Sequence, residues 1–195
     1  QSDNNLGAVP AALVEDAITL DGGTLKFNPS AASNLALAAN RGITLGASGG
    51  TIDTTPITSS FTATVAGEIS GNGDLTVFAN GDTSDTGAGL GGAAVLSGYG
   101  TFFGTTAIKS GVVTMDSYFG DASNPVTLDG GGIVDQNHNN TFSHDIRIAA
   151  GGGVIRSYGS TTSTISGAVA NAPGVASASI RLTDTGIRVL SGDGS

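Results

Sequence analysis

The sequence predicts an all-β fold of the solenoid class, in which the chain winds through stacked coils as a parallel β-helix. Three observations lead to this prediction. Apolar residues alternate in short strings, glycine is unusually abundant, and segments of the sequence return in the same order further along the chain.

Short strings of alternating apolar residues indicate half-buried strands, because successive side chains of a strand point to opposite faces. No stretch of ten or more residues shows the 3.6-residue period of a helix. The nearest, residues 31–39, is interrupted by Ser33 and Asn34. The apolar-x-apolar units lie at Ile18/Leu20, Ile43/Leu45, Leu75/Val77, Ile108, Val126/Leu128, Ile146/Ile148 and Ile180/Leu182.

Glycine is expected at the corners between strands. The chain has 32 glycines in 195 residues, more than twice the usual share of about 7%. A corner needs positive φ angles, which glycine adopts without steric cost, and a corner side chain would collide with the coils above and below. The expected corners are the glycine runs at 22–23, 49–50, 91–92, 130–132 and 151–153.

The sequence also repeats itself. Residues 18–25 (ITLDGGTL) return at 126–133 (VTLDGGGI), and residues 43–52 return at 146–155 in the same order. We therefore expect one β-helix domain over residues 1–195, with an internal duplication of about 6–118 and 119–195. The second copy is truncated at Ser195 and the chain starts at Gln1 without Met, so we expect a fragment of a longer protein.

Apolar units about 20–25 residues apart match one coil of a solenoid, which predicts roughly nine coils. The N-terminal stretch Leu6–Val14, which contains Pro10, is expected to fold over the first coil as a cap. A sandwich or jelly roll built from antiparallel hairpins is the alternative all-β fold. Asn80-Gly81 is the one tight hairpin signal in a strand context.

The charge of the chain excludes several classes of partner. The formal net charge is −9, from 16 acidic and 7 basic residues. Such a surface repels the phosphates of nucleic acid and anionic membranes. No apolar run approaches the ~20 residues of a membrane span. Cysteine is absent, which excludes a disulfide scaffold and fits large exported bacterial proteins.

Two segments resemble a known repeat family. Residues 69–77 (ISGNGDLTV) and 94–113 (AVLSGYGTFFGTTAIKSGV) are similar to the autotransporter-associated β-strand repeat. The resemblance implies a right-handed parallel β-helix in long secreted or surface-anchored bacterial proteins, where it serves as stalk, passenger or adhesin. It implies no catalytic residues. The aromatic position of the family falls on Phe102, which leaves Tyr99 and Phe103 as additions specific to this chain.

We therefore expect a non-catalytic extracellular module of a larger secreted or cell-surface protein, acting as a stalk and as an adhesive or carbohydrate-binding surface. Its expected partners are a polysaccharide or cell-surface glycan and adjacent domains of the same polypeptide. The alternative is a catalytic β-helix that degrades polysaccharide as a lyase or glycoside hydrolase. Such a hydrolase needs two carboxylates across the scissile bond, and the local sequence supports no particular pair.

No cofactor, metal or catalytic residue is predicted. His138, His144 and Asp145 could form an acid–base or metal group, but they are interpreted as solvated loop residues because no third ligand has metal-site spacing. The run Gly71–Leu75 faintly resembles a calcium-binding nonapeptide and is interpreted as a turn. Asp82 and Asp85 could hold a weak surface calcium ion.

The placement of the ten aromatic residues separates core from surface. Tyr99, Phe103, Tyr118 and Tyr158 lie beside glycines in expected loops, where exposed rings could stack on the faces of sugars. These four residues are the candidate glycan-binding residues. Five others are expected in the core: Phe27, Phe61, Phe78, Phe102 and Phe142.

Overall fold

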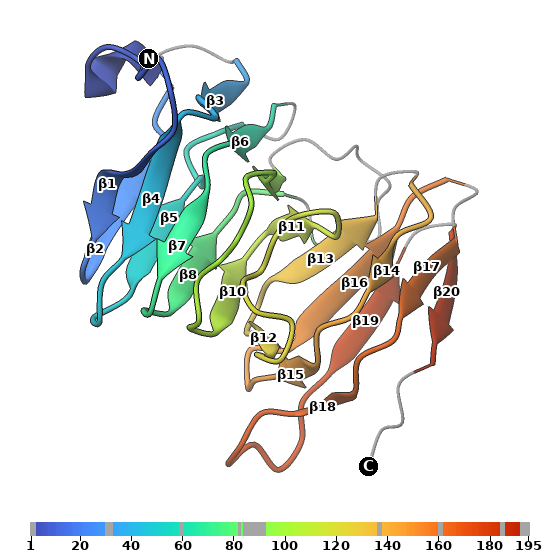
Figure 1. The fold of residues 1–195 in the computed structure, drawn as a ribbon. Helices are drawn as coiled ribbons and strands as arrows, with labels where there is room; N and C mark the ends of the chain where they lie inside the picture. The colour runs from blue at the N-terminus through green and yellow to red at the C-terminus, as the bar shows by residue number, and fades with distance from the viewer. Residues whose placement is uncertain are drawn as a thin grey trace.

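The chain folds into parallel β-strands with almost no helix (Figure 1). The computed structural model describes residues 3–29, 33–58, 61–81, 83, 93–135, 138–159, 162–183 and 186–191. Within them the only helical element is a short 3-10 helix, η1 (Asp3–Leu6). Every recorded strand pairing is parallel. The predicted all-β, parallel character is confirmed, and the hairpin-based alternative is wrong for the described strands.

Within the described residues, twenty strands form four sheets, which we call A to D. Sheet A contains β1 (Val14–Leu20), β4 (Arg41–Leu45) and β7 (Ile69–Gly71). Sheet B contains β2 (Gly23–Lys26), β5 (Gly50–Asp53), β8 (Leu75–Phe78), β10 (Thr106–Ser110), β12 (Val126–Leu128), β15 (Ile146–Ile148) and β18 (Val169–Asn171). Sheet C contains β3 (Leu35–Leu37), β6 (Ala63–Val65), β9 (Ala94–Leu96), β11 (Val112–Thr114), β13 (Gly132–Asp135), β16 (Gly153–Ser157) and β19 (Ile180–Thr183). Sheet D contains β14 (Thr141–Phe142), β17 (Thr162–Ile165) and β20 (Ile187–Leu190).

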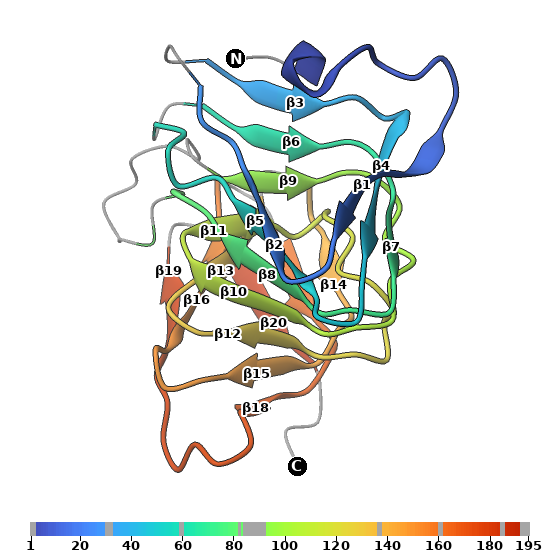
Figure 2. The same ribbon diagram turned by 90° about the vertical axis from the view of Figure 1, so that its left-hand side faces the viewer.

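The chain visits these sheets in a fixed order. Strands β1, β2 and β3 belong to sheets A, B and C, and β4, β5 and β6 then pair beside them in the same order. Figure 2 shows β3, β6 and β9 stacked one below another. In the later part of the chain the order is B, C, D, from β12 to β20. Stacked parallel sheets of this kind are compatible with the expected solenoid.

Two segments without regular strand structure, one containing Thr101 and the other Asp121, lie between sheets A and D along the stack. The amide of Thr101 donates to the Ile69 carbonyl at 2.8 Å, and the amide of Asp121 donates to the Phe102 carbonyl at 3.1 Å. Sheets B and C each hold seven strands within the described residues, so the roughly nine coils expected from the sequence are not confirmed.

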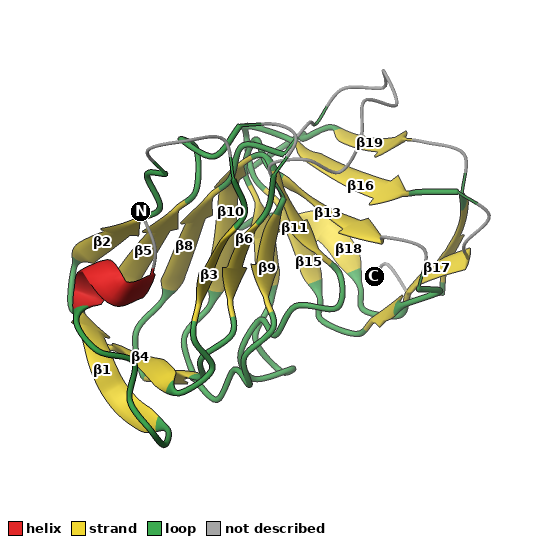
Figure 3. Ribbon diagram, turned by 90° about the horizontal axis from the view of Figure 1, so that it is seen from above, coloured by secondary structure: helices red, strands yellow, loops and turns green. Residues whose placement is uncertain are grey.

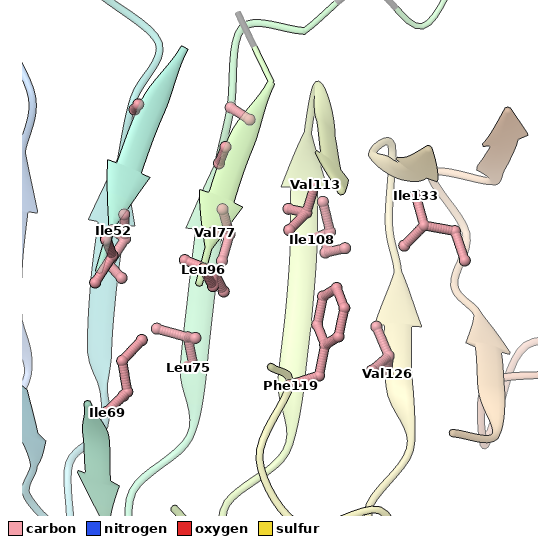
Figure 4. Close-up of a cluster of buried hydrophobic side chains, with 14 of the residues drawn as sticks. Ile52, Ile69, Leu75, Val77, Leu96, Ile108, Val113, Phe119, Val126 and Ile133 are labelled. Carbon is pink, nitrogen blue, oxygen red and sulfur yellow. The ribbon is translucent and has the colours of Figure 1, made fainter. Parts of the chain in front are cut away.

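The core lies between the sheets and is built from columns of aliphatic side chains. In sheet B, Leu25, Ile52, Val77, Ile108 and Leu128 follow one another in register. Ile52, Val77, Ile108 and Leu128 have no exposed surface, and Figure 4 shows side chains from several strands meeting in this interior. Burying one such side chain stabilises the fold by about 1.5–3 kcal/mol.

Glycine corners permit the close stacking, as the sequence predicted. Gly22, Gly49, Gly130 and Gly152 all have positive φ, and the run at 91–92 lies outside the described residues. One of the two tightest approaches is at Gly98, where an added Cβ atom would overlap the carbonyl oxygen of Gly67 on the preceding coil. A larger residue there would push the two coils apart.

The repeated segments fold alike but lie on different sheets. Residues 18–25 form β1, a glycine corner and β2, which joins sheet A to sheet B. Residues 126–133 form β12, a glycine corner and the start of β13, which joins sheet B to sheet C. The second copy is therefore rotated by one sheet relative to the first.

The N-terminal segment packs against the first coil. Arg41 is 4% exposed. Its guanidinium pairs with Asp3 and donates to the carbonyls of Leu6, Gly7 and Ala8. Figure 3 shows η1 at the end of the molecule that carries β1 and β2. This placement agrees with the expected cap, although the clamped residues begin at Asp3 rather than Leu6.

Candidate functional site

Two of the most exposed aromatic side chains stack on one another at the surface. The rings of Tyr99 and Tyr118 have their centroids 4.8 Å apart and their planes at 28°. The side chains are 68% and 41% exposed, and Phe103, four residues after Tyr99, is 66% exposed. We call Tyr99, Phe103 and Tyr118 the aromatic platform. Two of the four candidate residues are therefore in contact, and a third lies close to them along the chain.

The strand stacking fixes the backbone of the platform. The carbonyl of Tyr99 accepts from the amide of Ile69 at 2.9 Å, and the amide of Tyr118 donates to the carbonyl of Leu96 at 2.9 Å. These bonds place Tyr99 and Tyr118 on successive coils, at equivalent corners after sheet C. Gly100 faces this second coil closely, since a Cβ atom added to it would lie 3.1 Å from the Cβ atom of Tyr118.

Phe103 points outward because its neighbour points inward. Phe102 is fully buried, so the alternation of an extended backbone places Phe103 at the surface. The amide of Phe103 donates to the Gly71 carbonyl at 2.9 Å. Its own carbonyl accepts from the side-chain amide of Asn124 at 2.5 Å. Phe102 is therefore a core residue, as expected, and Tyr99 and Phe103 lie on the surface.

Tyr158 is separate from the platform along the stack. It follows β16 and is half-buried, and its amide donates to the carbonyl of Asp135 at 3.1 Å. Among the residues expected in the core, Phe27, Phe102 and Phe142 are buried and Phe61 is partly buried. The expectation for Phe78 is wrong: this side chain is 38% exposed, because it occupies an outward position at the end of β8.

The two histidines have different environments. His138 is exposed and its Nδ1 lies 3.7 Å from a carboxylate oxygen of Asp116. His144 is buried, packs against the rings of Phe119 and Phe142, and has its Nδ1 3.0 Å from the Asn124 carbonyl. Interpreting His144 as a solvated loop residue is therefore wrong, because its position two residues after Phe142 places it on the inward side. Asp145 is half-exposed and pairs with Arg147 at 3.2 Å.

Many of the aspartates fasten one coil to the next. Their side chains accept hydrogen bonds from backbone amides of the following coil: Asp21 from Ser48 at 2.7 Å, Asp74 from Thr105 at 2.7 Å, Asp129 from Gly151 at 2.9 Å and Asp145 from Ala168 at 2.9 Å. Asp74 belongs to the run Gly71–Leu75 that resembles a calcium site, and in the structure its carboxylate stabilises a corner by accepting the Thr105 amide. Asp82 and Asp85 lie outside the described residues.

These hydrogen bonds favour the ionised carboxylates. The Ser48 amide lowers the pKa of Asp21, and the Lys109 ammonium together with the Gly151 amide lowers the pKa of Asp129. The Ser123 hydroxyl and amide lower the pKa of Asp121. A lowered pKa makes Asp21, Asp121 and Asp129 weaker bases and moves each of them away from the pKa that an acid–base catalyst needs near neutral pH.

Asp135 is a buried carboxylate whose role the sequence did not predict. It has no exposed surface and accepts from the amides of His138 and Asn140 and from the Ser163 hydroxyl. These bonds compensate for burying the charge and fold the polar stretch after β13. The signal in the sequence was an Asp at an inward position two residues after Ile133.

The described residues contain no cluster of three or more His, Cys, Asp or Glu side chains placed to hold a metal ion. They also contain no helix with the length and apolar character needed to cross a membrane. A small cavity of about 90 Å³ lies at the N-terminal end, between η1 and the first coil. It is lined mainly by apolar atoms, including those of Leu25, Phe27 and Leu35.

Comparison of the chain with family models, with curated proteins and with solved structures found no match.

Proposed function

We propose that this chain is a right-handed parallel β-helix that serves as a non-catalytic, extracellular module of a larger secreted or surface protein. In this proposal the stacked sheets form a rigid stalk and the aromatic platform binds glycan. The cyclic order of sheets A, B and C supports the solenoid. The resemblance of residues 69–77 and 94–113 to autotransporter-associated repeats supports the exported context.

The stack of Tyr99 on Tyr118 is the observation on which the binding function rests. Large exposed aromatic rings are unfavourable on a free surface unless they serve a contact. The flat face of a pyranose ring buries apolar C–H groups against such a ring, while its hydroxyls stay in water. Tyr99 and Phe103 lie on one coil and Tyr118 on the next, so a glycan could contact more than one coil.

Rigidity supports this binding mode. The backbone around the platform is held by the Ile69–Tyr99 and Gly71–Phe103 hydrogen bonds and by the buried Phe102. A preorganised surface loses little conformational entropy when it binds. Seven stacked strands in sheet B span roughly 30 Å at about 4.8 Å per strand, which suits a segment of a longer stalk.

Binding and catalysis are separated by one experiment. The chain is incubated with insoluble polysaccharides, and both the bound fraction and the chain length of the polymer are measured. We expect retention without shortening, and weaker retention for Tyr99→Ala and Tyr118→Ala. The matched control is Phe78→Ala, which removes an exposed ring from sheet B. New reducing ends, or equal retention of all variants, would contradict the proposal.

A further inference from the structure

We propose that the ligand of the aromatic platform is a glycan that carries amino groups, in preference to a neutral or an acidic one. This inference rests on the proposed function, since it specifies the chemistry of the glycan at the same surface. It is drawn from the charges that lie around Tyr99, Phe103 and Tyr118, and from the way the rings are stacked.

Carboxylates lie next to both coils that carry the platform. On the coil before Tyr99, Glu68 accepts a hydrogen bond from the Thr101 hydroxyl at 2.8 Å, and Thr101 lies between Tyr99 and Phe103. On the coil of Tyr118, Asp121 is exposed, and its amide donates to the carbonyl of Phe102. A ligand lying on the rings would therefore meet negative charge near both coils.

A third carboxylate lies close to Tyr118 along the chain. Asp116 is two residues before Tyr118, and its side chain is 44% exposed. The one basic side chain recorded next to it is His138, at 3.7 Å. The Asp116 side chain is therefore partly accessible to a ligand from solvent.

The lysines and arginines with described side chains are engaged elsewhere. Lys26, Lys109 and Arg147 lie on strands of sheet B and pair with Asp53, Asp129 and Asp145. Arg41 is buried under the N-terminal segment, and Arg156 is buried in sheet C. Arg181 lies on β19, where its guanidinium contacts the carbonyl of Thr83. Arg188 lies on β20.

This distribution selects among glycans by charge. A uronic acid or sulfate group on the platform would lie near the carboxylates of Glu68, Asp116 and Asp121, and no lysine or arginine with a described side chain is paired with any of these three, so binding is unfavourable. An ammonium group would be attracted by the same carboxylates and by the electron-rich faces of the tyrosine rings. Each exposed cation–π contact contributes about 0.5–1 kcal/mol, which corresponds to about two- to fivefold in affinity.

The test uses three soluble hexasaccharides of matched length: β-1,4-glucosamine, its fully N-acetylated form, and galacturonic acid. Affinity is measured by calorimetry at pH 6 and low salt. We expect the glucosamine hexamer to bind most tightly and the galacturonate hexamer most weakly. Raising the salt should weaken binding of the glucosamine hexamer selectively, because exposed charges are screened.

Variants separate the charge contribution from the stacking contribution. Asp116→Asn and Glu68→Gln should each weaken binding of the glucosamine hexamer about two- to fivefold and leave the N-acetylated hexamer unchanged. Asp16→Asn is the matched control. It removes an exposed carboxylate from β1. This carboxylate is three strand spacings, or about 14 Å, from the coil of Tyr99 along the stack, which is beyond the ~10 Å screening length at 0.1 M salt. Tyr118→Ala should weaken the binding of both the glucosamine hexamer and the N-acetylated hexamer.

The outcomes distinguish failure of this inference from failure of the proposed function on which it rests. Equal binding of the amino and N-acetylated hexamers, or preference for the galacturonate, would overturn the inference and leave glycan binding in place. Absence of binding to all three hexamers and to the insoluble polysaccharides would overturn the proposed function and the inference together.

Discussion

Arg41 and Asp3 form an ion pair across 38 positions of the sequence, with Nε and Oδ1 3.0 Å apart. Their side chains are only 5% and 12% exposed, so the pair is sequestered from water. The same guanidinium donates to three backbone carbonyls of residues 6–8. One side chain therefore fastens the N-terminal segment to the start of β4.

Replacing Arg41 with Gln should destabilise the N-terminal coils by about 3 kcal/mol, because it leaves the Asp3 carboxylate and several carbonyls without their donor in a buried site. Urea denaturation measures the loss, and hydrogen exchange should show it concentrated in β1 and β4. Lys26→Gln is the control, since it removes an exposed pair with Asp53 that contributes less than about 1 kcal/mol. Equal losses of unfolding free energy for the two substitutions would show that Arg41 does not stabilise the N-terminal segment.

Gly98→Ala should be among the most destabilising single-methyl additions in the chain. The new Cβ would overlap the Gly67 carbonyl oxygen, so the coils must separate, at a cost of about 1–3 kcal/mol or more. Gly174→Ala is the comparison, because Gly174 has φ of +80° but open space around it. If thermal unfolding gave Gly98→Ala the smaller loss, close coil packing at this corner would be refuted.

Stability should fall in acid. Asp21, Asp53, Asp121 and Asp129 have lowered pKa values in the folded chain. Their contribution is therefore full above the unfolded value of about 3.9 and is lost as the pH falls through the lower folded values. The urea midpoint should be lower at pH 3 than at pH 5.

Asp129→Asn should reduce that difference between pH 5 and pH 3, because Asp129 accepts from Gly151 of the next coil and pairs with Lys109. Asp16→Asn removes an exposed carboxylate from β1 and should leave the difference as it is. A urea midpoint that stays constant from pH 5 to pH 3 in the unsubstituted chain would count against these carboxylates as coil fasteners.

Adjacent residues of β5 should respond very differently to truncation. Ile52 has no exposed surface, whereas Thr51 is a half-buried outward residue of the same strand. Ile52→Ala should cost about 2–5 kcal/mol through lost burial and the cavity left behind. Thr51→Ala should cost less than about 1 kcal/mol. Similar denaturation midpoints for the two variants would be incompatible with this assignment of inward and outward faces.

The sequence by itself determined which residues face inward and where the chain turns. Alternation places Leu75 and Val77 inside and Phe102 inside with Phe103 outside, since side-chain direction in an extended strand depends only on its neighbours. The glycine at 22, 49, 130 and 152 marks corners because positive φ is a local property. Local rules of this kind operate within a few residues, so the sequence exposes them directly.

The tertiary structure alone decided which corners lie on top of one another. Successive coils differ in length, with 31 residues from Val77 to Ile108 but 20 from Ile108 to Leu128. Strand pairing therefore fixes contacts that no constant period predicts. It rotates the second copy of the repeat by one sheet, buries His144 against Phe119, and stacks Tyr99 on Tyr118. Which residues meet in these contacts depends on the lengths of all the intervening loops. Hydrogen bonding between coils sets the alignment, and it does so only in the folded chain.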